Sequence, residues 1–388
     1  MRKHTGTRLG MLAAALALAA LLATPAVAQE TIKIGFFAPI TGPAAADGAS
    51  ATHAVELAVK EVNAAGGIKG KKVALIVYDD RLNPQEAVAI ANKLIERDQV
   101  IGVVSGSYSG PTRVSAPIFA KAGIPMVAGY AVHPDVTRAG ESNFRNGFLG
   151  EVEGAAAGDY AVKTLKTRKF AVIYMDNDFG REISAGFKKR AQKLGAAVVA
   201  EQVYKFPGEK DFRPYLTRIK DAGPDLIFAA GYYNEAALIC RQAKELGVTA
   251  QIMGEEGFDS PKYIELAGKD AEGVIIATNL DRDDPRPVVQ NFLKNYRQAY
   301  KTEADMVGAS SYDAFMILAS AIEKAGTDRK AIVQALKETK DYNGLTGKIQ
   351  RFMKGEVVKP VQIQVVKDGQ FRRHGIVDNP EVITPPVQ

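Results

Sequence analysis

The sequence has very few of the residues on which disulfides, thiol chemistry and metal binding depend. It contains one cysteine, Cys240, so no disulfide can form within the chain. Tryptophan is absent, and histidine occurs only at His4, His53, His133 and His374. No two of these histidines have the spacing of metal ligands. We therefore expect neither a metal site nor a cofactor, and Cys240, within an apolar helical stretch, is expected to pack as a small hydrophobic residue.

The motifs of nucleotide-binding and hydrolytic enzymes are also missing. No glycine-rich loop ends in Gly-Lys-Ser or Gly-Lys-Thr, and no Gly-x-Gly-x-x-Gly follows a predicted strand. Segment 106–110 superficially resembles a nucleophile elbow, but Tyr108 occupies the position that a nucleophilic serine needs. The acidic clusters at 79–80 and 281–284 are more typical of strand ends and surface loops than of a cation site. We therefore expect that the protein is not an enzyme.

The sequence has only one long hydrophobic run, which lies near its start. Arg2, Lys3 and Arg8 lead into the apolar run 9–23, which is shorter than the roughly 20 residues of a typical membrane span. Residues 24–28 end in a small-x-small pattern typical of a signal-peptidase site. We predict that residues 1–28 are a cleaved signal peptide and that the protein is secreted to the periplasm. An N-terminal membrane anchor is the alternative.

The net charge and the length become informative once this leader is set aside. The formal net charge is +6, and three of the positive charges belong to Arg2, Lys3 and Arg8. No block of Lys and Arg with interleaved aromatics occurs, so nucleic acid is not an expected partner. Residues 29–388 are long enough to suggest two domains, which can bury a core without disulfides.

Predicted strands and helices alternate along the rest of the chain. Short apolar runs bounded by loops predict strands at 32–37, 73–78, 100–104, 125–127, 170–175, 197–203, 226–229 and 274–277. Apolar residues at helical spacing predict helices at 48–65, 84–97, 110–122, 180–194, 212–222 and 235–246. Beyond residue 281 helices dominate, over 285–301 and 307–324, before strands near 348–352 and 361–366. Because the rhythm restarts near Gly150, the pattern predicts two doubly wound α/β lobes with parallel sheets. Ligands bind such sheets outside the carboxyl ends of the strands.

Several phrases along the chain resemble one family, the leucine/isoleucine/valine-type periplasmic binding proteins of ABC importers. The most recognisable phrase is Val-Asn-Ala-Ala-Gly-Gly-Ile-Lys-Gly at 62–70. Other matching phrases, in order, lie at 32–35, 41–43, 78–80, 83–84, 121–125, 179–180, 208–212, 231–232, 241–243 and 254–257. No single phrase is decisive, but their order and spacing cover essentially all of the chain after the leader.

The resemblance implies a type I periplasmic binding fold, with two parallel-sheet lobes joined by a three-strand hinge. Lobe one would comprise 29–149 plus 279–358, and lobe two 150–278 plus 359–388. Such proteins close around a ligand and present the closed form to a permease in the inner membrane. The resemblance therefore implies a monomer whose partners are a small-molecule ligand and an ABC permease.

The resemblance also implies which residues hold the ligand. Ser109 matches a hydroxyl that grips the carboxylate of an amino acid where a helix begins, although it could simply cap that helix. Glu256 matches the carboxylate that binds the ammonium group, and a surface loop acid is the alternative. Tyr232 matches a tyrosine of the cleft, or else is a core aromatic at a strand end.

Four positions depart from the pattern of the leucine-binding members. Tyr130 and Val132 stand where the family contributes a backbone carbonyl and a hydroxyl, so a threonine-like hydroxyl is missing. Phe179 replaces a cleft tyrosine, and Asp47 stands at a tyrosine position. We include Tyr130, Val132 and Phe179 among the ligand-binding residues. Tyr130 could fill the pocket, favouring a smaller ligand, or stack on an aromatic one.

The predicted function is capture of a hydrophobic or branched-chain amino acid for an ABC importer, with hinge closure. The alternative keeps that role but changes the ligand to an aromatic or aliphatic carboxylate, or to a small amide such as urea. An anionic ligand without an amine would have to leave Glu256 protonated or turned away. From other classes, a ligand-sensing receptor module or an exported enzyme remains open.

Overall fold

The computed structural model describes residues 31–386 of the chain. The predicted signal peptide, residues 1–28, lies outside these residues. The chain from Ile32 onward forms one compact unit. In the described part of the chain, no helix is both long and apolar enough to cross a membrane.

The first sheet is entirely parallel, with its strands in the order β2-β1-β3-β4-β5. These strands are β1 (Ile32–Ala38), β2 (Val73–Asp79), β3 (Gly102–Ser105), β4 (Met126–Ala128) and β5 (Asn143–Arg145). The central strands β3 and β4 are buried throughout, which explains their near-continuous apolar sequence.

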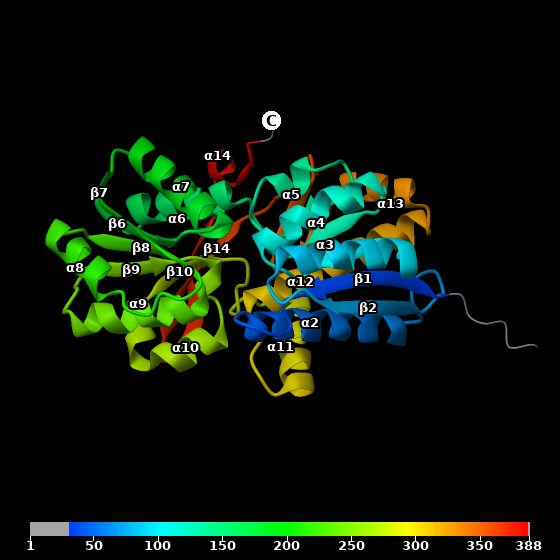
Figure 1. Ribbon diagram of the computed structural model, residues 1–388, viewed down its shortest axis with the longest axis horizontal. Helices are drawn as coiled ribbons and strands as arrows, with labels where there is room; N and C mark the ends of the chain where they lie inside the picture. Colours follow the sequence, from blue (N-terminus) through cyan, green and yellow to red (C-terminus); the bar gives the residue numbers. More distant parts are fainter. Residues whose placement is uncertain (1–30, 387–388) are drawn as a thin grey trace, which may run out of the picture. The chain divides into compact units, whose positions relative to one another are not determined.

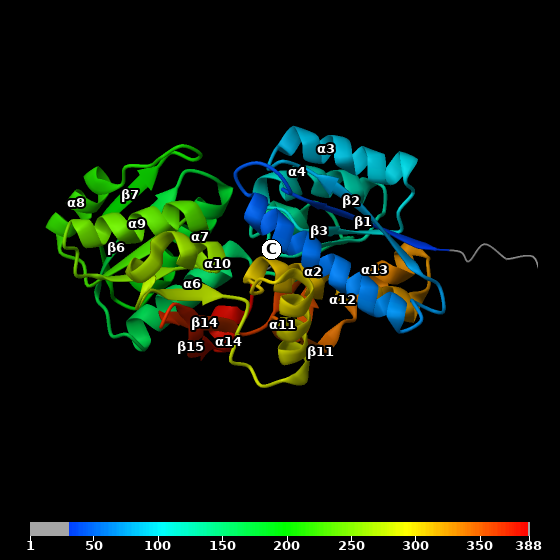
Figure 2. The same cartoon turned by 90° about the horizontal axis from the view of Figure 1, so that it is seen from below.

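Helices cover both faces of this sheet (Figures 1 and 2). On one face α2 (Ala45–Ala64) packs against α12 (Met306–Ala325), and on the other α3 (Pro84–Asn92) packs against α4 (Ser109–Lys121). The same part of the chain also carries α5 (Asp135–Arg138), α11 (Pro287–Tyr300) and α13 (Arg329–Lys337). Helix α12 begins where the Asp305 carboxylate accepts a hydrogen bond from the Gly308 N–H at 2.7 Å.

The second sheet has seven strands in the order β15-β14-β10-β9-β8-β6-β7. Its parallel part consists of β6 (Lys169–Met175), β7 (Ala197–Tyr204), β8 (Leu226–Ala230), β9 (Gln251–Gly254) and β10 (Ile275–Thr278). At one edge β14 (Val361–Lys367) and β15 (Gln370–Val377) add an antiparallel pair. The helices of this region are α6 (Gly150–Lys163), α7 (Asp178–Lys193), α8 (Arg213–Ala222), α9 (Tyr233–Glu245), α10 (Pro261–Ala267) and α14 (Pro380–Ile383). In Figure 1, α6 and α7 lie on one side of the sheet and α8, α9 and α10 on the other.

A small antiparallel sheet of β11 (Lys340–Gly344), β12 (Gly347–Met353) and β13 (Glu356–Val358) completes the fold. The chain passes between the regions of the two large sheets three times, through 146–149, 279–286 and 359–360. The predicted fold class, two doubly wound lobes joined by three connections, is confirmed. The antiparallel pairing of β14 and β15 adds a detail that the sequence pattern did not specify.

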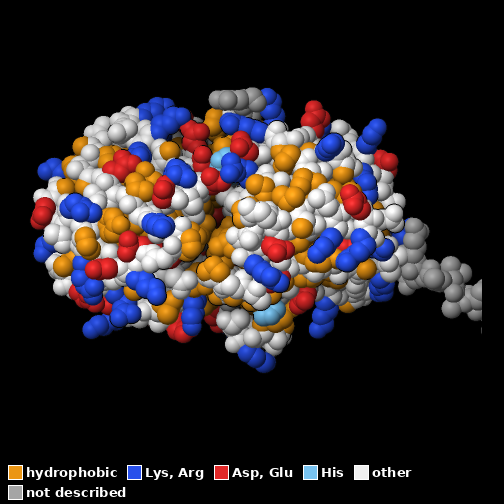
Figure 3. Space-filling view, in the orientation of Figure 1, with side chains coloured by type: hydrophobic (Ala, Val, Ile, Leu, Met, Phe, Trp, Pro, Cys, Tyr) orange, Lys and Arg blue, Asp and Glu red, His pale blue; other side chains and the backbone are white. Residues whose placement is uncertain are grey.

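The surface shown in Figure 3 is mixed in character. Acidic and basic side chains are scattered over most of this face, whereas hydrophobic side chains gather along a hollow near its middle. Scattered exposed charges are ordinary for a protein surface. Ligands of such sheets bind outside the carboxyl ends of the strands, so those ends are where we look for a site.

Candidate functional site

Five of the six predicted ligand-binding residues line one small cavity at the carboxyl ends of both large sheets. Its volume is only about 10 Å³, which is close to the space that one water molecule needs. Its lining consists of Asp47, Tyr108, Ser109, Tyr130, Phe179, Tyr232, Glu256, Gly257, Met306 and Val307. The loops after β3 and β4 supply one side, and those after β6, β8 and β9 supply the other.

Val132, the sixth predicted residue, lies behind the lining rather than in it. Its backbone N–H donates a hydrogen bond of 3.0 Å to the Ser109 hydroxyl, and both residues are buried. Ser109 is the first residue of α4, and the N-cap position is Tyr108, which makes no side-chain cap bond. The Ser109 hydroxyl is therefore held in place by the backbone of Val132 and does not cap the helix.

Aromatic rings form most of the cavity wall. Tyr108 stacks on Tyr232, with ring centroids 4.3 Å apart and planes at 21°. Tyr130 meets Tyr108 edge-on at 5.8 Å, and Phe179 lies 5.1 Å from Tyr232. The Tyr130 hydroxyl donates to the Gly106 carbonyl at 2.7 Å. Because Tyr108 and Tyr232 touch face to face, these two rings fill most of the space between the two sides of the site.

Glu256 presents a buried carboxyl group with one unpartnered oxygen. Its Oε2 accepts a hydrogen bond of 2.9 Å from the Asn279 side chain, whereas Oε1 has no partner among the described residues. Burial is the main reason that the pKa of Glu256 lies well above its usual value, with the neighbouring Glu153 carboxyl raising it further and the Lys359 ammonium opposing the shift. Such a group is costly to ionise unless a cation or a donor meets it.

Asp47 is a second buried acid in the lining, in the first turn of α2. Its carboxylate accepts a hydrogen bond from the Tyr108 hydroxyl. Burial, reinforced by the nearby Asp305, raises the pKa of Asp47 to about 8, although the Tyr108 hydrogen bond works in the other direction. In the sequence, Asp47 is recognisable only as a departure from the leucine-binding pattern, and it is not among the predicted ligand-binding residues.

Sequence reasoning also missed Tyr108 as a site residue, although it had noted the residue in the false nucleophile elbow. Its position between a strand end and the start of α4 is the signal that could have identified it, because that is where ligands approach such sheets. Gly257, Met306 and Val307 were missed too. Met306 and Val307 open α12, whose first turn no motif had connected with the cavity.

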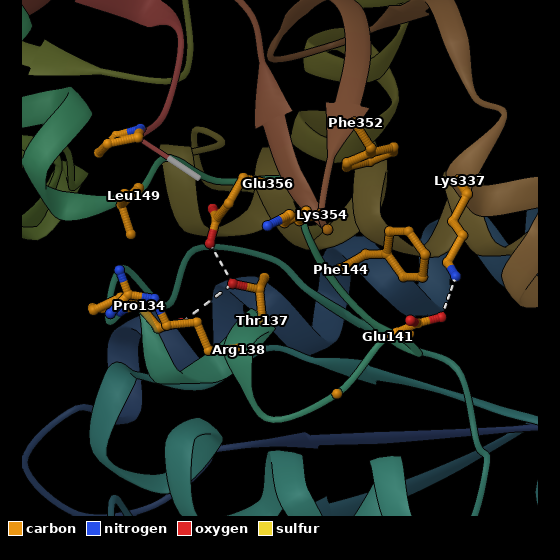
Figure 4. Close-up of a pocket in the computed structure, with 13 residues that line it drawn as sticks. Pro134, Thr137, Arg138, Glu141, Phe144, Leu149, Lys337, Phe352, Lys354 and Glu356 are labelled. Carbon is orange, nitrogen blue, oxygen red and sulfur yellow. Dashed lines mark hydrogen bonds and ion pairs between the residues drawn. The ribbon is translucent and has the colours of Figure 1, made fainter. Parts of the chain in front are cut away.

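A larger cavity, of about 660 Å³, has none of the predicted residues in its lining (Figure 4). Both of its carboxyl groups already pair with protein groups. Lys337 bonds Glu141 at 2.6 Å, and Glu356 accepts hydrogen bonds from Thr137 and from the buried Arg145. Phe144 and Phe352 meet edge-on at 5.5 Å at its apolar end. Its volume alone therefore does not mark it as the ligand site.

Metal and thiol chemistry find no support in the described part of the chain. Within residues 31–386, no group of three or more His, Cys, Asp and Glu side chains could hold a metal ion. Cys240 is buried, its sulfur lies 3.3 Å from the Tyr263 hydroxyl, and burial raises the pKa of its thiol to about 12. A buried thiol of this kind is inert.

The comparisons with known proteins agree with this geometry. Residues 31–370 match the family model described as "Periplasmic binding protein". The chain is 31% identical to the leucine-, isoleucine-, valine-, threonine- and alanine-binding protein of Pseudomonas aeruginosa, over 87% of this chain and 90% of that protein.

Two solved structures are also similar. A leucine binding protein of Thermotoga maritima has a TM-score of 0.83 and 30% identity, with 90% of this chain and 99% of that chain covered. A branched-chain amino acid transporter substrate binding protein of Streptococcus pneumoniae, solved with isoleucine, has a TM-score of 0.82 and 28% identity, with 90% and 99% covered. The chain belongs to the periplasmic binding protein family, and it is a solute-binding protein rather than an enzyme.

Proposed function

We propose that this protein is the periplasmic solute-binding component of an ABC importer, and that it captures a hydrophobic or branched-chain amino acid, or a close relative that keeps the amino group. The observation that carries the proposal is the unpartnered Glu256 Oε1, buried in a cavity lined from both large sheets. The ligand ammonium would pair with this oxygen. The Ser109 hydroxyl and the first N–H groups of α4 would receive the ligand carboxylate.

Closure about the three connections supplies the transport signal in this proposal. We assign 29–149 plus 279–358 to lobe one and 150–278 plus 359–388 to lobe two. A ligand that touches Ser109 on one side and Glu256 on the other makes all its contacts only when the lobes meet, so it stabilises the closed form selectively. The closed form would then dock as a monomer on the permease in the inner membrane.

The contacts across the site show what a ligand must displace. Besides the Tyr108–Tyr232 stack, the Tyr233 hydroxyl donates to the Pro43 carbonyl at 3.4 Å. An amino acid needs far more than the space of about 10 Å³ in the cavity, so at least one ring must swing away when the ligand enters. The cavity of about 430 Å³ outside the stack, which Tyr108 and Tyr232 also line, offers room for such a movement.

The competing ligand class is a carboxylate without an amine. No Lys, Arg or His is among the residues that line the small cavity, whereas Asp47 and Glu256 both are. An anion would therefore meet two acids and no basic side chain, and the site favours a ligand that brings its own positive charge.

Thermal unfolding of the exported protein, freed of carried-over ligand by unfolding and refolding, tests the proposal. A true ligand at about 100 times its dissociation constant should add about 2.7 kcal/mol to the free energy of unfolding. Leucine, valine and alanine are compared with 4-methylpentanoate, benzoate and urea. Glu256→Gln should reduce the stabilisation to about 0.4–1.4 kcal/mol at the same ligand concentration, and the exposed Glu265→Gln serves as control. Stabilisation by the carboxylates alone would contradict the proposed ligand class and the role of Glu256.

A further inference from the structure

We propose that the physiological ligand is an organic cation with a net positive charge, held between the Asp47 and Glu256 carboxyl groups and against the aromatic rings that line the cavity. This inference rests on the proposed function, because it concerns the same cavity and sharpens the class of ligand. It predicts that an alkylated or quaternary ammonium compound, or an amine without a compensating carboxylate, binds better than a zwitterionic amino acid such as leucine.

The two acids face the cavity from opposite sides of the site. Asp47 belongs to α2, beside the first sheet, and Glu256 follows β9 of the second sheet. Only the Tyr108 hydroxyl bonds the Asp47 carboxyl group among the described residues, and Glu256 Oε1 has no partner. The lining supplies no basic side chain to either acid. Both carboxyl groups are thus available to one ligand when the lobes close around it.

The charges behind the lining do not neutralise Asp47. The two charged groups that act on it most strongly are themselves acids, Asp305 and Asp259. Asp305 is occupied as well, because its Oδ1 accepts hydrogen bonds from the Ser50 hydroxyl at 2.5 Å and from the Gly308 N–H. An ionised Asp47 in these surroundings needs a cation beside it, and a positively charged ligand would supply that cation.

Glu256 has two cations in its neighbourhood, Lys359 and Arg145, and both are engaged elsewhere; Arg145 pairs with Glu356 at 2.9 Å. The buried Lys359 donates a hydrogen bond of 2.7 Å to the Thr346 hydroxyl, and its ammonium lies 5.1 Å from the centre of the Phe148 ring. Burial lowers the pKa of Lys359 to about 7, although Asp313 and Glu256 both act to raise it. Lys359 therefore offers Glu256 at most a partial charge, and a ligand cation can still pair with this carboxyl group.

The aromatic rings add a second, independent attraction for a cation. Tyr108, Tyr130, Phe179 and Tyr232 all line the cavity, and their centroids lie 4.3 to 5.8 Å from a neighbouring ring of the set. The faces of aromatic rings attract cations, so separating the stacked Tyr108 and Tyr232 rings would expose a face to the ligand cation. A neutral hydrophobic side chain would also pack on these rings, but it would bring no positive charge to Asp47, whose hydrogen-bond partner is the Tyr108 hydroxyl.

Isothermal titration of the refolded exported protein at pH 7.5 tests the inference with ligands that differ only in charge. Leucinamide, leucine and 4-methylpentanoate share one carbon skeleton and carry net charges of about +0.7, 0 and −1 at this pH. Choline and its neutral isostere 3,3-dimethylbutan-1-ol form a second matched set. We expect each cation to bind about tenfold or more tightly than its neutral counterpart, and 4-methylpentanoate not to bind.

Asp47→Asn separates this inference from the proposed function. The variant should bring the affinities for leucinamide and leucine close together, because the carboxylate that favours net positive charge is gone. The exposed Asp176→Asn, at the mouth of the site, serves as control for the general field of the protein. A second readout is proton release, measured in two buffers of different ionisation enthalpy. Cation binding to the wild type should release a proton at pH 7.5, and Asp47→Asn should release fewer.

The outcomes distinguish the two claims. Leucine binding as tightly as leucinamide, with no effect of Asp47→Asn, would overturn the inference and leave the proposed function standing. Binding of 4-methylpentanoate in preference to every amine would overturn both. Failure of both leucinamide and choline to bind at millimolar concentration would also overturn the inference, and leucine would then decide the proposed function.

Discussion

Two cavities of this protein differ more in the state of their polar groups than in their hydrophobic walls. In the cavity of about 660 Å³ in Figure 4, Glu141 pairs with Lys337, and Glu356 pairs with Arg145 and Thr137. In the cavity of about 10 Å³, Glu256 keeps an unpartnered oxygen, and no basic residue stands in the lining. The carboxyl groups of the larger cavity are therefore paired, whereas in the smaller one a carboxyl oxygen lacks a partner among the described residues. We therefore propose the smaller cavity as the ligand site because of its unpartnered carboxyl oxygen, in spite of its smaller volume.

The largest effect should come from breaking a pair in the larger cavity. Glu356→Ala would leave the fully buried Arg145 guanidinium without its carboxylate. Removing one partner of a buried pair destabilises a protein by about 3–5 kcal/mol. Urea unfolding should show a loss of this size, while ligand affinity per folded molecule should stay unchanged. A loss of affinity in the folded fraction would mean that the two cavities are coupled.

Glu256→Gln in the smaller cavity should instead lower the ligand affinity and leave the stability almost unchanged. Glutamine keeps an oxygen for the Asn279 side chain, so the free energy of unfolding should change little. Hydrogen bonds to charged groups contribute about 1.5–3 kcal/mol, so affinity for an amine ligand should fall about 10- to 100-fold. Titration calorimetry measures the affinity and thermal unfolding the stability. Unchanged affinity would exclude Glu256 as the ammonium contact.

The pH dependence of the ligand-free protein should also report on the smaller cavity. Unfolded Asp47 loses its proton near 3.8, whereas in the folded protein its pKa is about 8. Between these values the folded state binds more protons, so this group's contribution to stability falls as pH rises, by at most about 1.4 kcal/mol per pH unit. Unfolding of wild type and Asp47→Asn from pH 4 to pH 8 measures the difference in slope.

Other groups share that pH window and set the background for this measurement. Those that act on Asp47 are Asp305, Asp259 and Tyr108, and the pKa of Asp305 is itself raised to about 6 by burial. Asp47→Asn should therefore reduce the slope without abolishing it. An identical slope in the two proteins would show that Asp47 is ionised in the empty cavity.

The smallest effect should come from the rim of the larger cavity. Lys337 and Glu141 form an exposed ion pair, with the Glu141 side chain 88% accessible. Exposed pairs contribute about 0–1 kcal/mol, so Lys337→Ala should shift thermal unfolding only slightly and should lose that shift at high salt. A larger, salt-independent loss would mean that Lys337 supports the wall of the cavity itself.

The sequence predicted the fold well because alternation of strands and helices is a local signal. Five residues predicted from the sequence line one cavity, because each follows the carboxyl end of a strand in one of the two large sheets. They are Ser109, Tyr130, Phe179, Tyr232 and Glu256. The family resemblance supplied their assignment as ligand residues, which stays a prediction, as do the lobe boundaries.

What the sequence could not provide depends on packing between distant segments. Val132 lies one layer behind the lining because its N–H is used to hold Ser109. Asp47 and Tyr108 are 61 residues apart, and their hydrogen bond forms only when the first turn of α2 meets the loop between β3 and α4. No periodicity along the chain encodes such a meeting, nor the antiparallel pairing of β14 with β15.

The stacked rings of Tyr108 and Tyr232 occupy space that a ligand in the proposed site would need. A stacked aromatic pair is worth about 0.5–1.5 kcal/mol beyond the area it buries, and any entering molecule must offer more than the ring it displaces. A solute whose contacts in the site are weaker than the contact between the two rings therefore does not displace them. In the proposed mechanism, the rings set an energetic threshold that a solute must exceed by its charge as well as by its shape.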